Sequence, residues 1–302
     1  MQVSSVRVTG TASAVVVAVM LGVAAGVGIL VAAVASRWPS IEAPRVAPVT
    51  VAAQVDEHPG LLRHLRRHYD PRTQTGVALI AGSAVVLAGA IGVGVLLAMV
   101  REHAGFARWD ARFAQFGADH AQEWTTRVLL DVSFVLGSTP AVIMLAIGIG
   151  AIEMVRRPNR AIPLFLAVVL GGQLLLSNTI KLVVDRARPD ILPLSAAAGT
   201  SFPSGHTTAA AASMATFALL LGRGRSRRTK VALAALAGAI AACVACSRVF
   251  LGVHWFTDVL AGLALGWGWF ALCSIAFGGR LLQFGAPVEE AEKMAQRTPI
   301  SS

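Results

Sequence analysis

Three polar stretches interrupt an apolar chain, and each carries residues that can bind or transfer an anionic group. The first runs from Lys181 to Pro189 and contains two cations, Lys181 and Arg188, that are seven residues apart. At that spacing both would lie on one face of a helix, which Pro189 then ends. Two cations on one face favour an anionic partner, although for this stretch alone snorkelling of the two side chains to lipid headgroups is the favoured explanation. Asp185, one turn after Lys181, is expected to pair with it.

The second stretch, Ser201–Thr207, has the pattern of a helix start. Ser204 can cap the helix, and Gly205 lets a ligand approach the backbone closely. The first amides of a helix favour an anion. His206 stands beside them and can donate or accept a proton near neutral pH. An ordinary capped helix with an interfacial histidine would have the same pattern.

The third stretch runs from Ser247 to Asp258 and holds Arg248, His254 and Asp258. His254 and Asp258 are spaced i,i+4, so one helix through both would let the carboxylate accept the ring N–H. The other ring nitrogen would then be free as a nucleophile or base. Arg248 offers a fork of donors to phosphate oxygens. The alternative is a salt bridge at a membrane edge, where an aspartate is costly.

Together the three stretches supply what phosphoryl transfer requires: donors for several oxygens, a nucleophile and a proton donor. No P-loop or carboxylate pair competes with them in the sequence. The residues therefore predict a metal-independent phosphoryl transferase. Residue chemistry alone leaves open which histidine attacks, although the Asp258 partner favours His254.

The composition places these residues in a membrane protein. The chain has 302 residues, of which 55% are hydrophobic and 14% charged, too apolar for a soluble domain. Its net charge of +10 comes from basic residues clustered between apolar runs, which indicates membrane orientation rather than nucleic-acid binding. Cys243, Cys246 and Cys273 all lie in apolar runs and are interpreted as packing residues.

Seven apolar runs are long enough to predict an all-α, polytopic membrane helix bundle. They cover 12–35, 76–100, 128–154, 161–184, 207–222, 231–247 and 256–278, and the third is interrupted at Gly137–Pro140, where the helix should kink or restart. The predicted domains are an N-terminal helix with a basic linker (1–75), a six-helix phosphatase core (76–278) and a mobile cytoplasmic tail (279–302). Ala33-Val34-Ala35 resembles a signal-cleavage site, but we expect the first helix to be retained.

Charge distribution predicts the orientation of the bundle. Seven spans place the basic segments 36–75, 155–160, 223–230 and 279–302 on one side, which the positive-inside rule makes cytoplasmic. The three polar stretches then all face the extracytoplasmic side. A cleaved first helix would put the basic loops outside, which supports its retention. The expected location is the cell membrane.

Two further segments are predicted to lie on the membrane surface. Residues 61–68 form a short basic amphipathic pattern, in which His64 and His68 have a spacing that suits a metal but lack further ligands. In 101–127, Phe106, Trp109 and Phe113 recur at helical spacing. This second helix either seals the bundle or receives a lipid chain.

The motif Lys181-x6-Arg188-Pro189, then Pro203-Ser204-Gly205-His206, then Ser247-Arg248-x5-His254-x3-Asp258 resembles the type 2 phosphatidic acid phosphatase superfamily, or lipid phosphate phosphatases. The resemblance covers about 76–278. It implies that His254 attacks phosphorus, Asp258 orients it and His206 protonates the leaving group. It also implies that Lys181, Arg188, Arg248, Ser204 and Gly205 hold the phosphate, and that neither metal nor cofactor is needed. The vanadium haloperoxidases are a soluble class of relatives with a similar anion site. The seven apolar runs argue against placing this chain in that soluble class.

The expected function is therefore hydrolysis of a lipid phosphate at the membrane through a phosphohistidine. Candidate substrates are polyprenyl pyrophosphate, favoured by the outward-facing site, phosphatidic acid and phosphatidylglycerophosphate. The alternatives are a phosphotransferase with the same residues and a catalytically silent lipid-phosphate binding or transport protein. The sequence predicts no oligomeric state.

Overall fold

The computed structural model describes residues 10–37, 74–192, 194–195 and 199–281. These residues form helices and connecting segments without a strand. The elements are α1 (Gly10–Arg37), α4 (Gln74–Glu102), the 3-10 helix η1 (Gly105–Trp109), α5 (Asp110–Asp119), α6 (Glu123–Gly137), α7 (Thr139–Arg156), α8 (Ala161–Val184), α9 (Gly205–Leu221), α10 (Arg227–Phe250) and α11 (Phe256–Leu281). The amphipathic segment expected at 61–68, with His64 and His68, and the tail from 282 lie outside the described residues.

The predicted all-α membrane bundle is confirmed. Within the described ranges, six helices are long and apolar enough to cross a membrane, namely α1, α4, α7, α8, α10 and α11. The remaining predicted span, the fifth along the chain (207–222), corresponds to α9, which is shorter at 17 residues. Most of its side chains are buried because α9 packs against α7, α8, α10 and α11 at the centre of the bundle. This central helix carries the second polar stretch at its N-terminus.

The third predicted span is divided where the sequence indicated a break. α6 ends at Gly137, and Ser138 is extended and caps α7 by accepting a hydrogen bond from the Ala141 amide. Pro140 lies in the first turn of α7, where the backbone N–H of a helix has no partner to lose. A side chain at Gly137 would meet Val244 and the backbone of His206. The break therefore brings the end of α6 directly against the start of α9.

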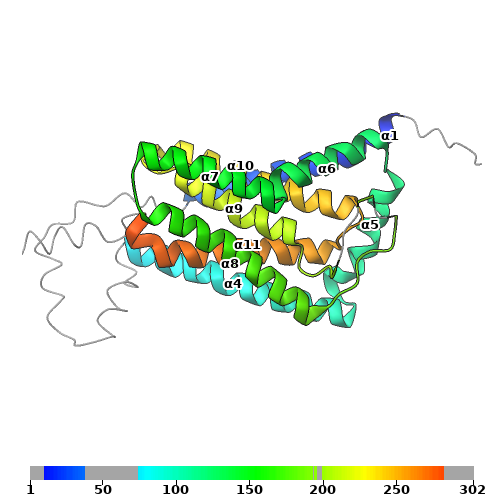
Figure 1. Ribbon diagram of the computed structural model, residues 1–302. Helices are drawn as coiled ribbons and strands as arrows, with labels where there is room; N and C mark the ends of the chain where they lie inside the picture. Colours follow the sequence, from blue (N-terminus) through cyan, green and yellow to red (C-terminus); the bar gives the residue numbers. More distant parts are fainter. Residues whose placement is uncertain (1–9, 38–73, 193, 196–198, 282–302) are drawn as a thin grey trace, which may run out of the picture.

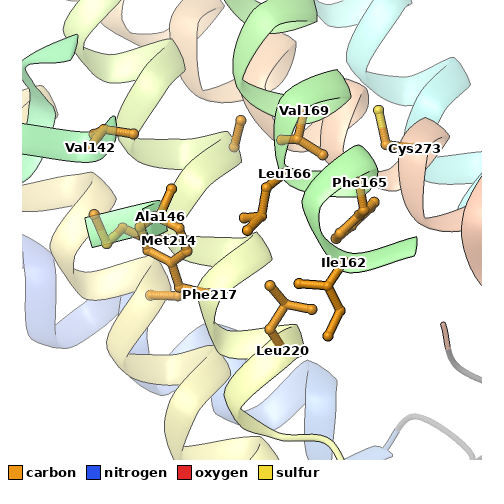
Figure 2. Packing of buried hydrophobic residues seen from close by; sticks show 12 residues of the cluster. Val142, Ala146, Ile162, Phe165, Leu166, Val169, Met214, Phe217, Leu220 and Cys273 are labelled. Carbon is orange, nitrogen blue, oxygen red and sulfur yellow. The ribbon is translucent and has the colours of Figure 1, made fainter. Parts of the chain in front are cut away.

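A hydrophobic cluster fixes α9 against its neighbours away from the polar stretches. Figure 2 shows its side chains converging from α7, α8, α9 and α11, including Phe165, Phe217 and Leu220, each at most 4% exposed. In a bilayer such contacts stabilise through close packing rather than through exclusion of water. The cluster sets the depth of α9, and with it the position of Ser204–His206.

Small residues let α11 lie almost on the backbone of α9. A methyl group at Gly266 would approach the Thr208 carbonyl oxygen to 2.6 Å, and one at Gly262 the Ser204 oxygen to 2.9 Å. The same approach allows the Ser204 amide to donate to the Asp258 carbonyl oxygen at 3.0 Å. The glycine face of α11 thus joins the second and third polar stretches.

The polar stretches gather at one end of the bundle. Figure 1 shows α5, the α8–α9 connection and the start of α11 together at that end, while the α7–α8 and α9–α10 connections lie at the other. α1 packs along α10, where Gly28 faces Ala235 and Ala239. The additional N-terminal helix therefore supports the helix that carries Arg248.

Candidate active site

The first polar stretch leaves its helix earlier than the sequence predicted. α8 ends at Val184, and Asp185 takes a left-handed backbone (φ 45°). The expected pair between Lys181 and Asp185 is wrong: Lys181 Nζ donates to the Thr200 carbonyl oxygen at 3.0 Å, and Asp185 is exposed. The helix stops because the left-handed residue turns the chain away, so that Lys181 faces the α8–α9 connection.

Arg188 reaches the same place from an extended segment rather than from a second helical turn. Its Nε donates to the Gly199 carbonyl oxygen at 2.9 Å, and Nη1 donates to the Val253 oxygen at 2.7 Å. Nη2 shares the Thr200 oxygen with Lys181, at 3.3 Å. The predicted convergence of the two cations is therefore present, although the helix predicted to produce it is not.

His254 lies in the turn before α11, not on a helix that also holds Asp258. The fold still brings them together: His254 Nδ1 is 3.5 Å from Asp258 Oδ2, longer than an ordinary hydrogen bond, and Nδ1 has no other acceptor in the described part of the chain. Arg188 Nη1 lies 3.2 Å from His254 Nε2. Because arginine can only donate, Nε2 is assigned as the acceptor and Nδ1 as the protonated nitrogen.

Burial determines the charge of the ring. It lowers the pKa of His254 to about 4, whereas Asp258 acts in the opposite direction. Burial also lowers the pKa of Arg188, again opposed by Asp258. At neutral pH the His254 ring is therefore neutral and has an unprotonated Nε2.

Arg248 occupies the last turn of α10 and is almost completely buried, at 6% exposure. Its Nη1 donates to the Ser133 hydroxyl at 2.9 Å, while Nε has no acceptor among the described residues. A buried guanidinium whose hydrogen-bond partner is a neutral hydroxyl has no negative charge to compensate its own positive charge. An anion with several oxygens would satisfy it.

The start of α9 completes the cluster. Ser204 stands at the predicted cap position, but its side chain does not cap the helix; instead it accepts from Thr207 Oγ1 at 3.0 Å. A methyl group at Gly205 would lie 3.8 Å from Ser177 Oγ and 3.9 Å from Lys181 Cε, so both side chains flank the helix start. His206 is within electrostatic range of all three cations and of His254.

All eight residues selected from the sequence therefore lie at one end of the bundle around the α9 N-terminus. A family model described as the PAP2 superfamily matches residues 162–281, which span α8 to α11. Phosphatidylglycerophosphatase B of Bacillus subtilis is 35% identical over 147 residues, covering 48% of this chain and 71% of that protein. The chain belongs to the PAP2 superfamily.

Other PAP2-related proteins extend the comparison. Lipid A 1-phosphatase of Rhizobium etli is 44% identical over 119 residues, which cover 36% of this chain but only 46% of that protein. The crystal structure of a transmembrane PAP2-type phosphatidylglycerolphosphate phosphatase from Bacillus subtilis aligns with a TM-score of 0.60 and 30% identity. The alignment covers 65% of this chain and 96% of the crystallised chain. The chain is thus a multi-pass membrane protein of a phosphatase family.

One set of buried polar residues near this PAP2 site was not selected from the sequence. Arg186 lies between the carboxylates of Asp110 and Asp258, and Thr257 donates to Asp110. Arg186 lies two residues before Arg188 in the sequence, but nothing in the sequence indicated its contact with Asp110, which lies on α5 in the segment predicted to form an interfacial helix. Ser177, Ser133 and Thr200 were also missed, because a lone serine or threonine in an apolar run carries no distinctive signal.

The described residues contain no group of three or more His, Cys, Asp or Glu side chains that could hold a metal ion. The donors around the α9 N-terminus are cations, hydroxyls and amides instead. This donor set suits an anion rather than a metal.

Proposed function

We propose that this protein hydrolyses a phosphate ester of a membrane lipid through a phosphohistidine at His254. The observation that carries the proposal is the two-sided contact of the His254 ring. Nε2 meets Arg188 at 3.2 Å and Nδ1 faces Asp258 at 3.5 Å, so a neutral ring presents its unprotonated nitrogen to a phosphate-binding cation. Membership of the PAP2 superfamily supports the same chemistry.

Binding would bring the phosphate to the N-terminus of α9. Lys181, Arg188 and Arg248 then bind its oxygens, and Arg248 Nε gains the acceptor that the described chain does not give it. Ser204 and the Gly205 amide assist from the helix start. Arg188 would exchange its contact with His254 Nε2 for a phosphate oxygen, which leaves Nε2 facing phosphorus.

In the first chemical step Nε2 attacks phosphorus while the bond to the lipid oxygen breaks. The three cations stabilise charge on the equatorial oxygens. Asp258 stabilises the positive charge that develops on the ring, through Nδ1. The negative charge of the bound phosphate offsets the burial and the three cations that disfavour a proton on His206, so that His206 is protonated in the complex. It donates this proton to the departing alkoxide, which leaves as the lipid alcohol.

In the second step water attacks the phosphorus of the phosphohistidine. His206, now neutral, accepts a proton from that water, and the N–P bond breaks with its electron pair returning to Nε2. Inorganic phosphate leaves, and both histidines regain their starting states. An alcohol that replaced water at this step would turn the same residues into a phosphotransferase.

Phosphatidylglycerophosphate is the first substrate to test, because the relative with that activity in its name aligns over 71% of its length. The 1-phosphate of a lipid A-like glycolipid is the second, because the local identity to such a phosphatase is higher, at 44%. Polyprenyl pyrophosphate and phosphatidic acid complete the panel. We assign catalysis to the core at 76–278, in the cell membrane with the site facing outward.

The proposal is tested with purified full-length protein in detergent, assayed on this panel with a chelator present. Phosphate release from at least one lipid, and its loss in His254→Ala, is expected. Binding without release would indicate a silent lipid-phosphate binding protein, and equal release by His254→Ala would overturn the mechanism. Product analysis with added glycerol separates hydrolysis from transfer.

A further inference from the structure

We infer that Asp110 and Arg186 are a positioning pair that fixes the orientation and effective charge of Asp258 behind His254. The inference rests on the proposed function. It concerns two residues outside the motif, one of which, Asp110, lies on α5, the helix predicted to lie at the membrane surface. Neither residue contacts the His254 ring in the described contacts, so both would act through Asp258.

The contacts form one continuous set of hydrogen bonds. Arg186 Nη1 donates to Asp258 Oδ1 at 2.6 Å and to Thr257 Oγ1 at 2.8 Å, while Nη2 donates to Asp110 Oδ2 at 2.7 Å. Asp110 also accepts from the Thr257 amide at 2.9 Å and from its hydroxyl at 2.8 Å. α5 and the start of α11 are therefore joined directly, through Thr257 and Asp110, and also through the Arg186 guanidinium.

Burial makes this arrangement energetically important. The side chains of Asp110 and Asp258 are 5% and 0% exposed, and that of Arg186 is 16% exposed. Breaking a buried ion pair by removing one partner is costly because it leaves an uncompensated charge. Arg186 also lies 5.4 Å from the ring centre of Trp255, which limits where the guanidinium can move.

The two oxygens of Asp258 have different partners. Oδ1 accepts from Arg186, whereas Oδ2 accepts from the Trp255 amide at 2.9 Å and faces His254 Nδ1. Rotation of the carboxylate would exchange these roles. Because Arg186 fixes Oδ1, it keeps Oδ2 directed at the ring. Because Arg186 is a cation, it also weakens the attraction of Asp258 for a proton on His254.

The effect of the Arg186 charge on the pKa of His254 has a predicted direction, which a purely structural role for Arg186 would not produce. The charged and titratable groups facing His254 are Arg188, Arg248, His206 and Asp258. Asp258 is the anion among them and raises the pKa of His254. Removing the Arg186 charge strengthens that effect, so protonation of His254 moves to higher pH. Removing the Asp258 charge moves it to lower pH.

The test compares Arg186→Gln, Arg186→Lys and Asp258→Asn in the full-length protein, on the lipid phosphate that the wild type hydrolyses. Arg186→Gln should lower kcat about 10- to 100-fold, as supporting residues behind a reactive group do, with little change in KM. The acid limb of its pH profile should move to higher pH, opposite to Asp258→Asn. Arg186→Lys keeps the positive charge, so the acid limb of its pH profile should lie closer to that of the wild type than the acid limb of Arg186→Gln does.

The matched control is Arg127→Gln, which breaks an exposed pair with Glu123 and should leave every parameter unchanged. The double variant Arg186→Gln/Asp258→Asn should lose little more activity than Asp258→Asn alone, because both changes act on one group. Additive losses, or an acid limb that Arg186→Gln leaves in place, would overturn the inference.

A direct titration separates this inference from the proposed function. Ring-nitrogen NMR of His254 in the wild type, Arg186→Gln and Asp110→Asn measures the midpoint without any substrate. In Asp110→Asn the Arg186 charge is compensated by Asp258 alone, so the titration midpoint of His254 should fall. In Arg186→Gln the midpoint of His254 should rise. If the midpoints shift in these directions but no lipid phosphate is hydrolysed, the proposed function fails. If hydrolysis occurs and they do not shift, the positioning pair fails.

Discussion

Lys181 and Arg248 are cations whose hydrogen-bond partners near the α9 N-terminus are neutral. Lys181 donates to a carbonyl oxygen and Arg248 to a hydroxyl, whereas Arg186 is compensated by two carboxylates. Positive charge without a facing anion is unfavourable in a buried site, and a phosphate reverses that balance. This contrast separates the residues proposed to bind substrate from the one proposed to orient Asp258.

Asp258→Asn tests the role of the carboxylate at the residue scale. Because burial holds the pKa of His254 at about 4 and Asp258 raises it, the substitution leaves the ring neutral at neutral pH. The variant should nevertheless lose about 10³- to 10⁴-fold in kcat, the effect of the equivalent change in a serine protease triad. Measurement of kcat at a series of pH values checks this, and recovery at alkaline pH would contradict it.

The motif residues could be selected from the sequence because their types and spacing are unusual within apolar runs. Arg186 and Asp110 could not, because their contact joins positions 76 residues apart. Asp110 follows Trp109 in a segment whose aromatic spacing indicated only a surface helix. Ser204 shows the reverse case: its position was predicted, but its hydroxyl partner is Thr207 rather than a helix amide.

At the scale of elements, η1 and α5 place an aromatic surface next to the site. The Phe113 and Phe256 rings pack in a tilted arrangement with 4.7 Å between their centres, and the Trp109 ring centre lies 6.5 Å from that of Phe256. Phe106 and Trp109 remain 43% and 44% exposed. Of the two roles considered for this helix, an exposed aromatic surface beside Asp110 favours contact with the lipid chain.

Trp109→Ser should therefore raise KM for a long-chain lipid phosphate in mixed micelles. It should leave KM for a short-chain, water-soluble analogue unchanged, because the phosphate contacts remain. Trp124→Ser is the matched control, since Trp124 is 45% exposed at the start of α6. Equal effects on both substrates would instead indicate a helix that only seals the bundle.

The contact between α9 and α11 makes a second prediction at this scale. Gly266→Ala places a methyl group 2.6 Å from the Thr208 carbonyl oxygen, and overpacking of this kind costs about 1–3 kcal/mol. Gly171→Ala is the control, because nothing lies within 4 Å of its methyl position. Thermal unfolding in detergent should show a lower Tm and weaker activity for the first variant alone. A Tm unchanged by Gly266→Ala would contradict the close approach.

Most helix positions followed from the apolar runs, but two helix ends did not. α10 begins at Arg227 and ends at Phe250, so it includes basic residues that the sequence assigned to the preceding loop. Long cationic side chains are compatible with a helix end at a membrane surface, and hydropathy alone misses them. α8 ends earlier than Pro189 required, because Asp185 turns the chain first.

At the scale of the whole molecule, charge differs between the two ends of the bundle. The end opposite the site exposes basic residues from the α7–α8 and α9–α10 connections and from the helix ends beside them, namely Arg156, Arg157, Arg160, Arg225, Arg227, Arg228 and Lys230. Glu153 is buried among them and pairs with Arg156 and Arg223. The positive-inside rule favours a cytoplasmic position for this end, and hence an outward-facing site.

Cysteine labelling tests this orientation in a background in which Cys243, Cys246 and Cys273 are replaced by alanine. Leu192→Cys lies at the site end and Ser226→Cys at the basic end, and both positions are exposed. An impermeant maleimide should label Leu192→Cys in intact cells and Ser226→Cys only after permeabilisation. The reverse pattern would place the site in the cytoplasm.

The most direct measurement of the central claim is identification of the covalent intermediate. Wild type and His206→Ala are mixed with a lipid phosphate, quenched without acid and mapped by mass spectrometry. Phosphate should be found on His254, with more accumulating in His206→Ala because water attack is slowed, and none in His254→Ala. Phosphate on another residue, or turnover by a His254→Ala protein, would contradict the account.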